Sequence, residues 1–258
     1  MKKPISVFIM DVTNSSQFVD MDMLSSYLDQ IVDWIQVWTQ GIVKTKAKHR
    51  FGDEIILVSD NFSTAFIIAS HITRLWAYEG YEPYFGCSFG YSRNEVSDID
   101  NIDTWNDPLV KIARRLLEQS KDKNSRTWMR MGSMDFDQQF IKLLNAESEK
   151  FALLRALQAK NQKVVSDLHF FYMWQNKVAD ILHKTPATVS SQLKKGRSEK
   201  VQEAYYNVEE SLSYLQQFPE YSKEPRIITG DTEGRLKDSI RFHVMQHLNM
   251  FFPDVAKE

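Results

Sequence analysis

The spacing of apolar residues changes near residue 138, and this change constrains the fold more than any other feature. Before it, short β-rich apolar runs alternate with helical stripes, and after it every periodic segment is helical. Strands separated by helices favour a mixed α/β (α+β) domain, and a run of helices alone favours a bundle. The 258 residues are enough for two domains of ordinary size. We expect an α/β domain at 1–137, an all-α domain at 138–218 and a one-helix extension at 219–258.

Within the first part, the patterns predict the order βαββαβ. Apolar residues between Leu24 and Trp38 recur every three or four positions, which is typical of a helix packed on a sheet. A second such helix runs to about Leu75. The runs with strand character are Ile5–Met10, Ile42–Arg50, Ile55–Val58, Pro83–Tyr91 and, further on, Thr127–Met131. The second and third of these runs form a hairpin with acidic residues at its tip.

The composition and the lengths of the apolar runs indicate where in the cell the protein is expected. The single cysteine, Cys87, lies in an apolar stretch, so no internal disulfide forms and we expect a buried thiol. No apolar run approaches the roughly 20 residues of a membrane span, and Asp11 interrupts the N-terminal run too early for a signal peptide. We therefore expect a cytoplasmic protein without a membrane partner. The net charge of -2 does not favour nucleic-acid binding by the chain as a whole, so such binding has to be judged from local clusters of basic residues.

Two acidic residues stand where adjacent strands end. Asp11 closes the first strand and Asp53 lies at the hairpin tip, so the two carboxylates lie side by side if these strands are neighbours. Such a pair suits Mg²⁺, which takes one or two protein carboxylates and completes its shell with water and substrate phosphates. The backbone amides leading into the first helix are expected to hold a nucleotide's phosphates. The residues concerned are Thr13, Asn14, Ser15 and Ser16. As a structural alternative, both acids are ordinary turn residues.

Four segments carry a family resemblance: Ile5–Ser16, Phe51–Glu54, Phe85–Gly90 and Asp107–Leu116. In order and spacing they resemble the class III nucleotide cyclases and the related GGDEF palm domains. A closer resemblance is to the SatD family, bacterial proteins that join such a domain to a helix-turn-helix, and it covers most of the chain. It implies a ferredoxin-like palm in the first part.

The same resemblance implies roles for individual residues. Asp11 and Asp53 match the metal ligands of the cyclases, and Arg115 matches an arginine that stabilises the transferring phosphates. Two positions depart from the cyclase pattern: Lys111 stands in place of an asparagine, and His49 in place of a purine-reading lysine. These departures argue against turnover and leave metal or nucleotide binding open.

The segment from Asn176 to Lys195 has the layout of a helix-turn-helix. Pro186 opens its second helix, with Thr185 as the expected cap, while Val189 and Leu193 face inward. Small, polar and basic residues face outward, as a major groove requires. The predicted DNA contacts are Lys184, Thr188, Ser190, Ser191, Lys194, Lys195 and Arg197. A helical hairpin used only for oligomerisation is the alternative.

Three functions follow from these features. The first is a SatD-like regulator that binds DNA, as a dimer on two half-sites, with a palm domain that binds a nucleotide or Mg²⁺. The second is an active Mg²⁺-dependent nucleotidyl cyclase in which Arg115 stabilises the transition state. The third is an interaction scaffold with neither ligand. His243 and His247 have zinc-ligand spacing but lack a third ligand, which favours a surface or core pair.

Overall fold

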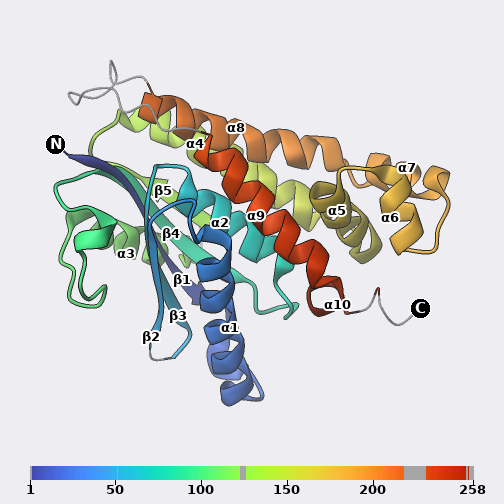
Figure 1. The fold of residues 1–258 in the computed structure, drawn as a ribbon, viewed down its shortest axis with the longest axis horizontal. Coiled ribbons are helices and arrows are strands. Elements are labelled where there is room, and N and C mark those ends of the chain that lie inside the picture. Colours follow the sequence, from blue (N-terminus) through green and yellow to red (C-terminus); the bar gives the residue numbers. More distant parts are fainter. Residues whose placement is uncertain (1, 51, 123–125, 218–230, 254, 256–258) are drawn as a thin grey trace.

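The computed structural model describes residues 2–50, 52–122, 126–217, 231–253 and 255. It is a mixed α/β fold with a five-stranded sheet and a group of long helices stacked beside it (Figure 1). The strands are β1 (Lys3–Val12), β2 (Thr45–Arg50), β3 (Glu54–Asp60), β4 (Pro83–Ser92) and β5 (Met129–Gly132). The helices of the first part are α1 (Met21–Thr39), α2 (Thr64–Leu75) and α3 (Pro108–Ser120), with 3₁₀ turns η1 (Ser15–Gln17) and η2 (Val96–Asp98). The others are α4 (Gln138–Ala156), α5 (Lys160–Tyr172), α6 (Gln175–Ile181), α7 (Pro186–Lys195), α8 (Ser198–Gln217), α9 (Thr232–Gln246) and α10 (Leu248–Phe251).

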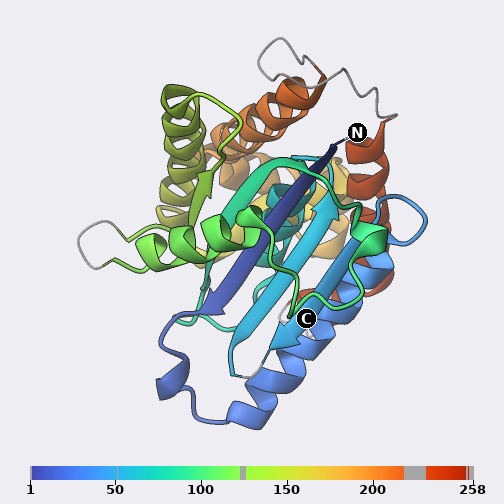
Figure 2. The ribbon, with the colours of Figure 1, turned by 90° about the vertical axis from the view of Figure 1, so that its left-hand side faces the viewer.

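The sheet has the strand order β2-β3-β1-β4-β5, so β1 lies at its centre (Figure 2). β1 is antiparallel to both β3 and β4, and β5 is parallel to β4. The chain order β1-α1-β2-β3-α2-β4 agrees with the predicted βαββαβ sequence of elements. The C-terminal end of β1 and the tip of the β2–β3 hairpin therefore lie next to each other at one end of the sheet.

Helices cover both faces of the sheet, which explains why most of β1 is apolar. Phe8 and Met10 belong to a cluster with residues of α1 and α2 on one face. Ile5, Val7 and Ile9 belong to a second cluster with α3 on the other face. Successive side chains of a strand point to opposite faces, and here each face meets a helix.

The larger apolar cluster runs without a break from the sheet into the helical part. It joins buried residues of α1 and α2 to residues of α4, α5, α8 and α9. The core therefore crosses the predicted boundary at residue 137. Independent folding of the parts 1–137, 138–218 and 219–258 stays a prediction.

A buried ion triad ties three helices together inside this core. Arg74 of α2 donates to Asp167 of α5 at 2.7 Å, and Arg155 of α4 donates to the same carboxylate at 2.5 and 3.0 Å. The side chains of Arg74 and Asp167 are 0% and 5% exposed. The Arg74 guanidinium also lies 4.0 Å from the centre of the Phe170 ring, a cation–π contact. The triad links the helix behind the sheet to the helical part.

Cys87 lies on β4 and is fully buried, as the sequence predicts. Burial raises the pKa of its thiol to about 12, so the group is a neutral part of the core. In the residues that the structure places, we find no helix with both the length and the apolar character needed to cross a membrane.

Asp60, at the end of β3, gives a testable pH dependence. Burial raises the pKa of its carboxyl from 3.8 to about 6. The folded state therefore holds the proton more tightly than the unfolded state, and stability falls as the pH rises from about 4 to 6. Replacing Asp60 with asparagine removes the cost of burying the charge. We expect the variant to gain on the order of 1 kcal/mol at pH 7.5, after allowance for solvent screening, and nothing at pH 4.

Urea unfolding of both proteins at the two pH values measures this difference. An equal gain at pH 4 and pH 7.5 would show that the asparagine acts through packing and not through the charge.

Candidate functional sites

Acidic residues converge at the end of the sheet where β1 stops. Asp11 lies directly opposite Glu54, the first residue of β3, and Asp53 precedes it at the hairpin tip. Opposite residues of an antiparallel pair share a face of the sheet. Burial raises the pKa of Asp11, and the nearby negative charges of Asp53 and Glu54 raise it further. The structure thus brings Asp11 and Asp53 into one cluster and adds Glu54, which sequence reasoning had left out.

Basic side chains of the chain itself pair with two of these acids. Lys121 Nζ lies 2.7 Å from Asp11 Oδ2. Arg114 donates to both oxygens of Glu54, with Nη2 2.8 Å from Oε1, and Arg50 Nη1 lies 3.1 Å from the same Oε1. Asp53 has no such partner in the described ranges. Ammonium and guanidinium groups therefore stand where a divalent ion would need to bind.

These contacts determine whether the acidic cluster can hold Mg²⁺. The described residues include no group of three or more His, Cys, Asp or Glu side chains arranged to hold a metal. Mg²⁺ needs only one or two carboxylates when phosphates supply further ligands, but here it would have to displace Lys121 and Arg114. As placed, the residues do not fit a resident Mg²⁺.

The guanidinium nearest the acidic cluster is Arg114, not the predicted Arg115. Arg115 is exposed on α3 and has no contact with Asp11, Asp53 or Glu54, and Lys111 is exposed as well. One residue along a helix turns the side chain by about 100°, so neighbouring arginines cannot both face the sheet. Val110, Arg114 and Leu117 share a helical side, a spacing that could have pointed to Arg114.

The predicted phosphate-binding residues do not lead into a helix. Asn14 has a left-handed φ of 52°, Ser15 and Ser16 belong to the three-residue turn η1, and α1 begins only at Met21. Asp20 caps α1 by accepting a hydrogen bond from the Met23 amide at 2.9 Å. The Thr13 amide and hydroxyl both bind the Glu82 carbonyl. The expected helix N-terminus at this site is therefore wrong, because Asp20 and not Ser15 or Ser16 supplies the cap.

In the helical part, α5, α6 and α7 pack on one another. Val178 and Ala179 of α6 and Val189 and Leu193 of α7 are buried between them. Thr185 caps α7, since its hydroxyl accepts from the Thr188 amide at 3.2 Å, and Pro186 is the first residue of the helix. The local packing matches the sequence pattern, with α5 as the supporting helix.

All seven residues predicted to contact DNA are exposed. They are Lys184, Thr188, Ser190, Ser191, Lys194, Lys195 and Arg197. Among residues with a described position, none of the four cations in this group pairs with an acid. The next cation along the chain, Lys200, does pair, with Glu203 at 2.6 Å. The outward face of α7 with its flanking loops therefore carries free positive charge.

Of the two histidines with zinc-ligand spacing, His243 of α9 is buried and His247, the residue after α9, is exposed. Trp38 Nε1 donates to His243 Nδ1 at 2.9 Å, and the His243 and His247 rings lie 4.8 Å apart. Burial lowers the pKa of His243, which favours the neutral ring that this bond requires.

Comparison with known proteins adds little to this geometry. No family model and no curated protein matches the chain. Among solved structures, the active GGEEF domain of a diguanylate cyclase from Vibrio cholerae is similar at 21% sequence identity. The alignment covers 49% of this chain and 83% of that domain, with a TM-score of 0.34. A likeness at this level carries no functional argument.

Proposed function

We propose that this chain is a DNA-binding regulatory protein in which α6 and α7 act as a helix-turn-helix and α7 enters the major groove. The observation that carries the proposal is the exposed face of α7, which presents hydroxyl and lysine side chains and no acid. A homodimer would place two such helices on two half-sites.

The dimensions and chemistry of α7 support this function. With its side chains an α-helix is about 10–12 Å in diameter, which fits the major groove, about 12 Å wide, and the ten residues of α7 span about 15 Å along it. Thr188, Ser190 and Ser191 are short enough to approach base edges, although the Thr188 hydroxyl also lies 2.9 Å from that of Thr185. Lys194 and Lys195, in the last turn, are placed for the phosphates.

The end of the sheet near Asp11 is where we propose that a nucleotide binds. Lys121, Arg114 and Arg50 supply cations that can contact phosphates. Because these cations already neutralise Asp11 and Glu54, Mg²⁺ would arrive with the nucleotide and not before it. The nucleotidyl cyclase alternative requires both Asp11 and Asp53 to be free for metal, and Lys121 is bound to Asp11, which is why we place it second.

The decisive variant replaces Lys194 and Lys195 with alanine. Each phosphate contact contributes about 0.9 to the slope of log K against log salt concentration. The double variant should therefore bind mixed genomic duplex roughly tenfold more weakly, with a slope smaller by about two. Fluorescence anisotropy at several salt concentrations measures both quantities.

The matched control replaces two exposed lysines elsewhere with alanine, Lys111 of α3 and Lys142 of α4. This control should keep the parent protein's DNA affinity and salt slope. Equal losses in both double variants would mean that binding follows overall charge, and the α7 proposal would then fail. Repeating the titration with a nucleoside triphosphate and Mg²⁺ tests the second part. An unchanged affinity would show that the nucleotide does not influence DNA binding and would leave the DNA contact standing.

A further inference from the structure

The outer edge of β2 carries main-chain groups that no other strand uses. β2 is the edge strand of the sheet, and of the strands described only β3 pairs with it. The Lys44 carbonyl accepts from the Asp60 amide at 3.0 Å. Bonded and non-bonded pairs alternate along an antiparallel ladder, so the residues one, three and five positions after Lys44 direct N–H and C=O away from β3. These residues are Thr45, Ala47 and His49.

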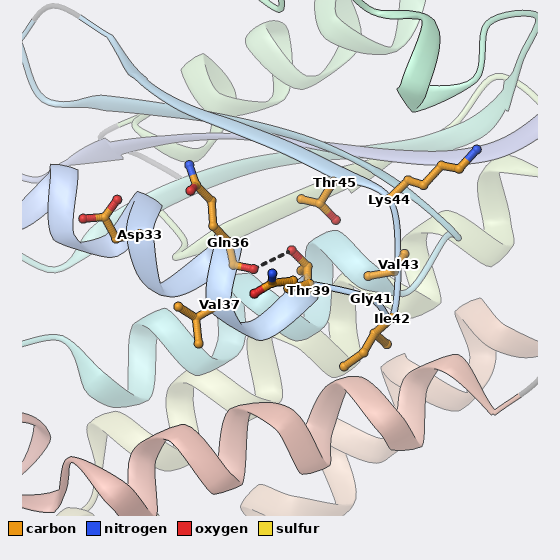
Figure 3. A pocket seen from close by; sticks show the side chains of 10 residues that line it. Asp33, Gln36, Val37, Thr39, Gly41, Ile42, Val43, Lys44 and Thr45 are labelled. Atoms are coloured by element: carbon orange, nitrogen blue, oxygen red, sulfur yellow. Dashed lines mark hydrogen bonds between the residues drawn. The ribbon is translucent and has the colours of Figure 1, made fainter.

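Beside this edge lies an open hollow of about 880 Å³ between α1 and the start of β2 (Figure 3). Asp33 and Gln36 of α1 and Thr45 of β2 are among the residues that line it. Figure 3 shows the Gln36 side chain extending from α1 toward the strands. The hollow leaves room beside the edge for side chains of an added strand.

The charge beside this edge is negative on the side of α1. Asp29 and Asp33 are exposed on one stripe of α1. Asp29 contacts His49 at 2.9 Å but its side chain is 67% exposed, and Asp33 has no cationic partner in the residues that the structure covers. On the opposite face of β2, Lys48 and Arg50 are already bound to Asp103. Lys46, on the same opposite face, donates to the Ile99 carbonyl. On the α1 side of the open edge, the uncompensated charge is therefore that of the α1 carboxylates.

We propose that the β2 edge binds an extended basic segment of a partner protein, which adds to the sheet as a further antiparallel strand. The main chain of the segment bonds to Thr45, Ala47 and His49, which span about 14 Å at 3.4 Å per residue. Opposite residues of an antiparallel pair share a face, so alternate side chains of the segment face α1. Basic side chains at those positions meet Asp29 and Asp33. Affinity comes from the backbone bonds, and the preference for a basic segment comes from the two carboxylates.

The probe is a blocked seven-residue peptide in which arginine alternates with threonine, labelled for fluorescence anisotropy with the full chain. We expect it to bind roughly tenfold more tightly than the same peptide with glutamate in place of arginine. In an antiparallel addition, the residues that face α1 also turn their amides toward β2. Methylating the arginine amides should therefore abolish binding, and methylating the threonine amides should not. Equal binding of the two methylated peptides overturns strand addition.

A substitution in the protein, in place of a change in the peptide, tests the same β2 edge. Proline at position 47 removes one outward N–H and no bond to β3, and an edge strand tolerates it there. Ala47→Pro should weaken peptide binding roughly tenfold, whereas Ala47→Ser keeps the amide and should bind as the parent does. Thermal unfolding of both variants checks that the fold is retained. Sedimentation completes the test, because a dimer that Ala47→Pro converts to a monomer would make a second copy the occupant and overturn the proposal.

Discussion

Replacing Asp167 with alanine is expected to lower the free energy of unfolding by about 3–5 kcal/mol. The substitution leaves Arg74 and Arg155 facing each other inside the core without the carboxylate that holds both. Arg74 cannot turn to water, since its side chain is 0% exposed. Uncompensated buried charge is among the most costly single defects that a folded protein can carry.

Urea unfolding followed by tryptophan fluorescence measures this loss. Asp180→Ala is the matched control, because Asp180 is an exposed acid on the neighbouring helix α6 and should cost less than about 0.5 kcal/mol. Replacing all three members of the triad with apolar residues of similar volume should recover most of the stability. A small loss in Asp167→Ala would mean that water reaches the arginines.

The second large effect is expected for Gly86→Ala on β4. A Cβ atom at this position would lie 2.0 Å from the Ala113 carbonyl oxygen and 2.3 Å from the Leu117 amide nitrogen. Both atoms belong to the backbone of α3, so the helix has to move away from the sheet and loosen the cluster that it forms with β1. We expect a loss of about 3 kcal/mol.

Gly132→Ala on β5 is the matched control for that substitution. Its new Cβ would meet side chains and no backbone: Leu116 Cδ1 at 3.0 Å, which can shift, and Ile112 Cγ2 at 3.6 Å, an ordinary contact. The control should lose about 1 kcal/mol. Similar losses in both variants would show that α3 adjusts as a whole, and the close helix–strand approach at Gly86 would not be the cause.

The elements were predictable from the sequence because each carries its own periodic signal. The stripe from Leu24 to Trp38 is buried in α1 as expected, and the predicted strand Pro83–Tyr91 differs from β4 by one residue. The start of α1 was not predictable in this way. Ser15, Ser16 and Asp20 are all suitable caps, and the packing of Phe18 against Tyr78 and Tyr81 accompanies the later start.

The ion pairs could not be predicted from the sequence. Asp11 and Asp53 are recognisable as strand-end acids, but nothing local to them shows that Lys121 comes to Asp11 from the far end of α3. Likewise, Arg74 and Asp167 are 93 residues apart in the chain. Such contacts depend on how α2, α3 and α5 are placed by the whole core, and not on the residues beside each charged group.

The contact between Trp38 of α1 and His243 of α9 has a consequence for synthesis, because the two residues are separated by 205 positions. A ribosome adds roughly 5–20 residues each second, so α1 waits roughly 10–40 s for this partner. During that interval Trp38 lacks its partner on α9, and the nearby ring of Trp34 lacks Phe251, whose ring centre lies 4.7 Å from its own in the folded protein. The nascent N-terminal half therefore displays two tryptophans whose final cover is supplied only when the residues of α9 and α10 have been added and pack on α1.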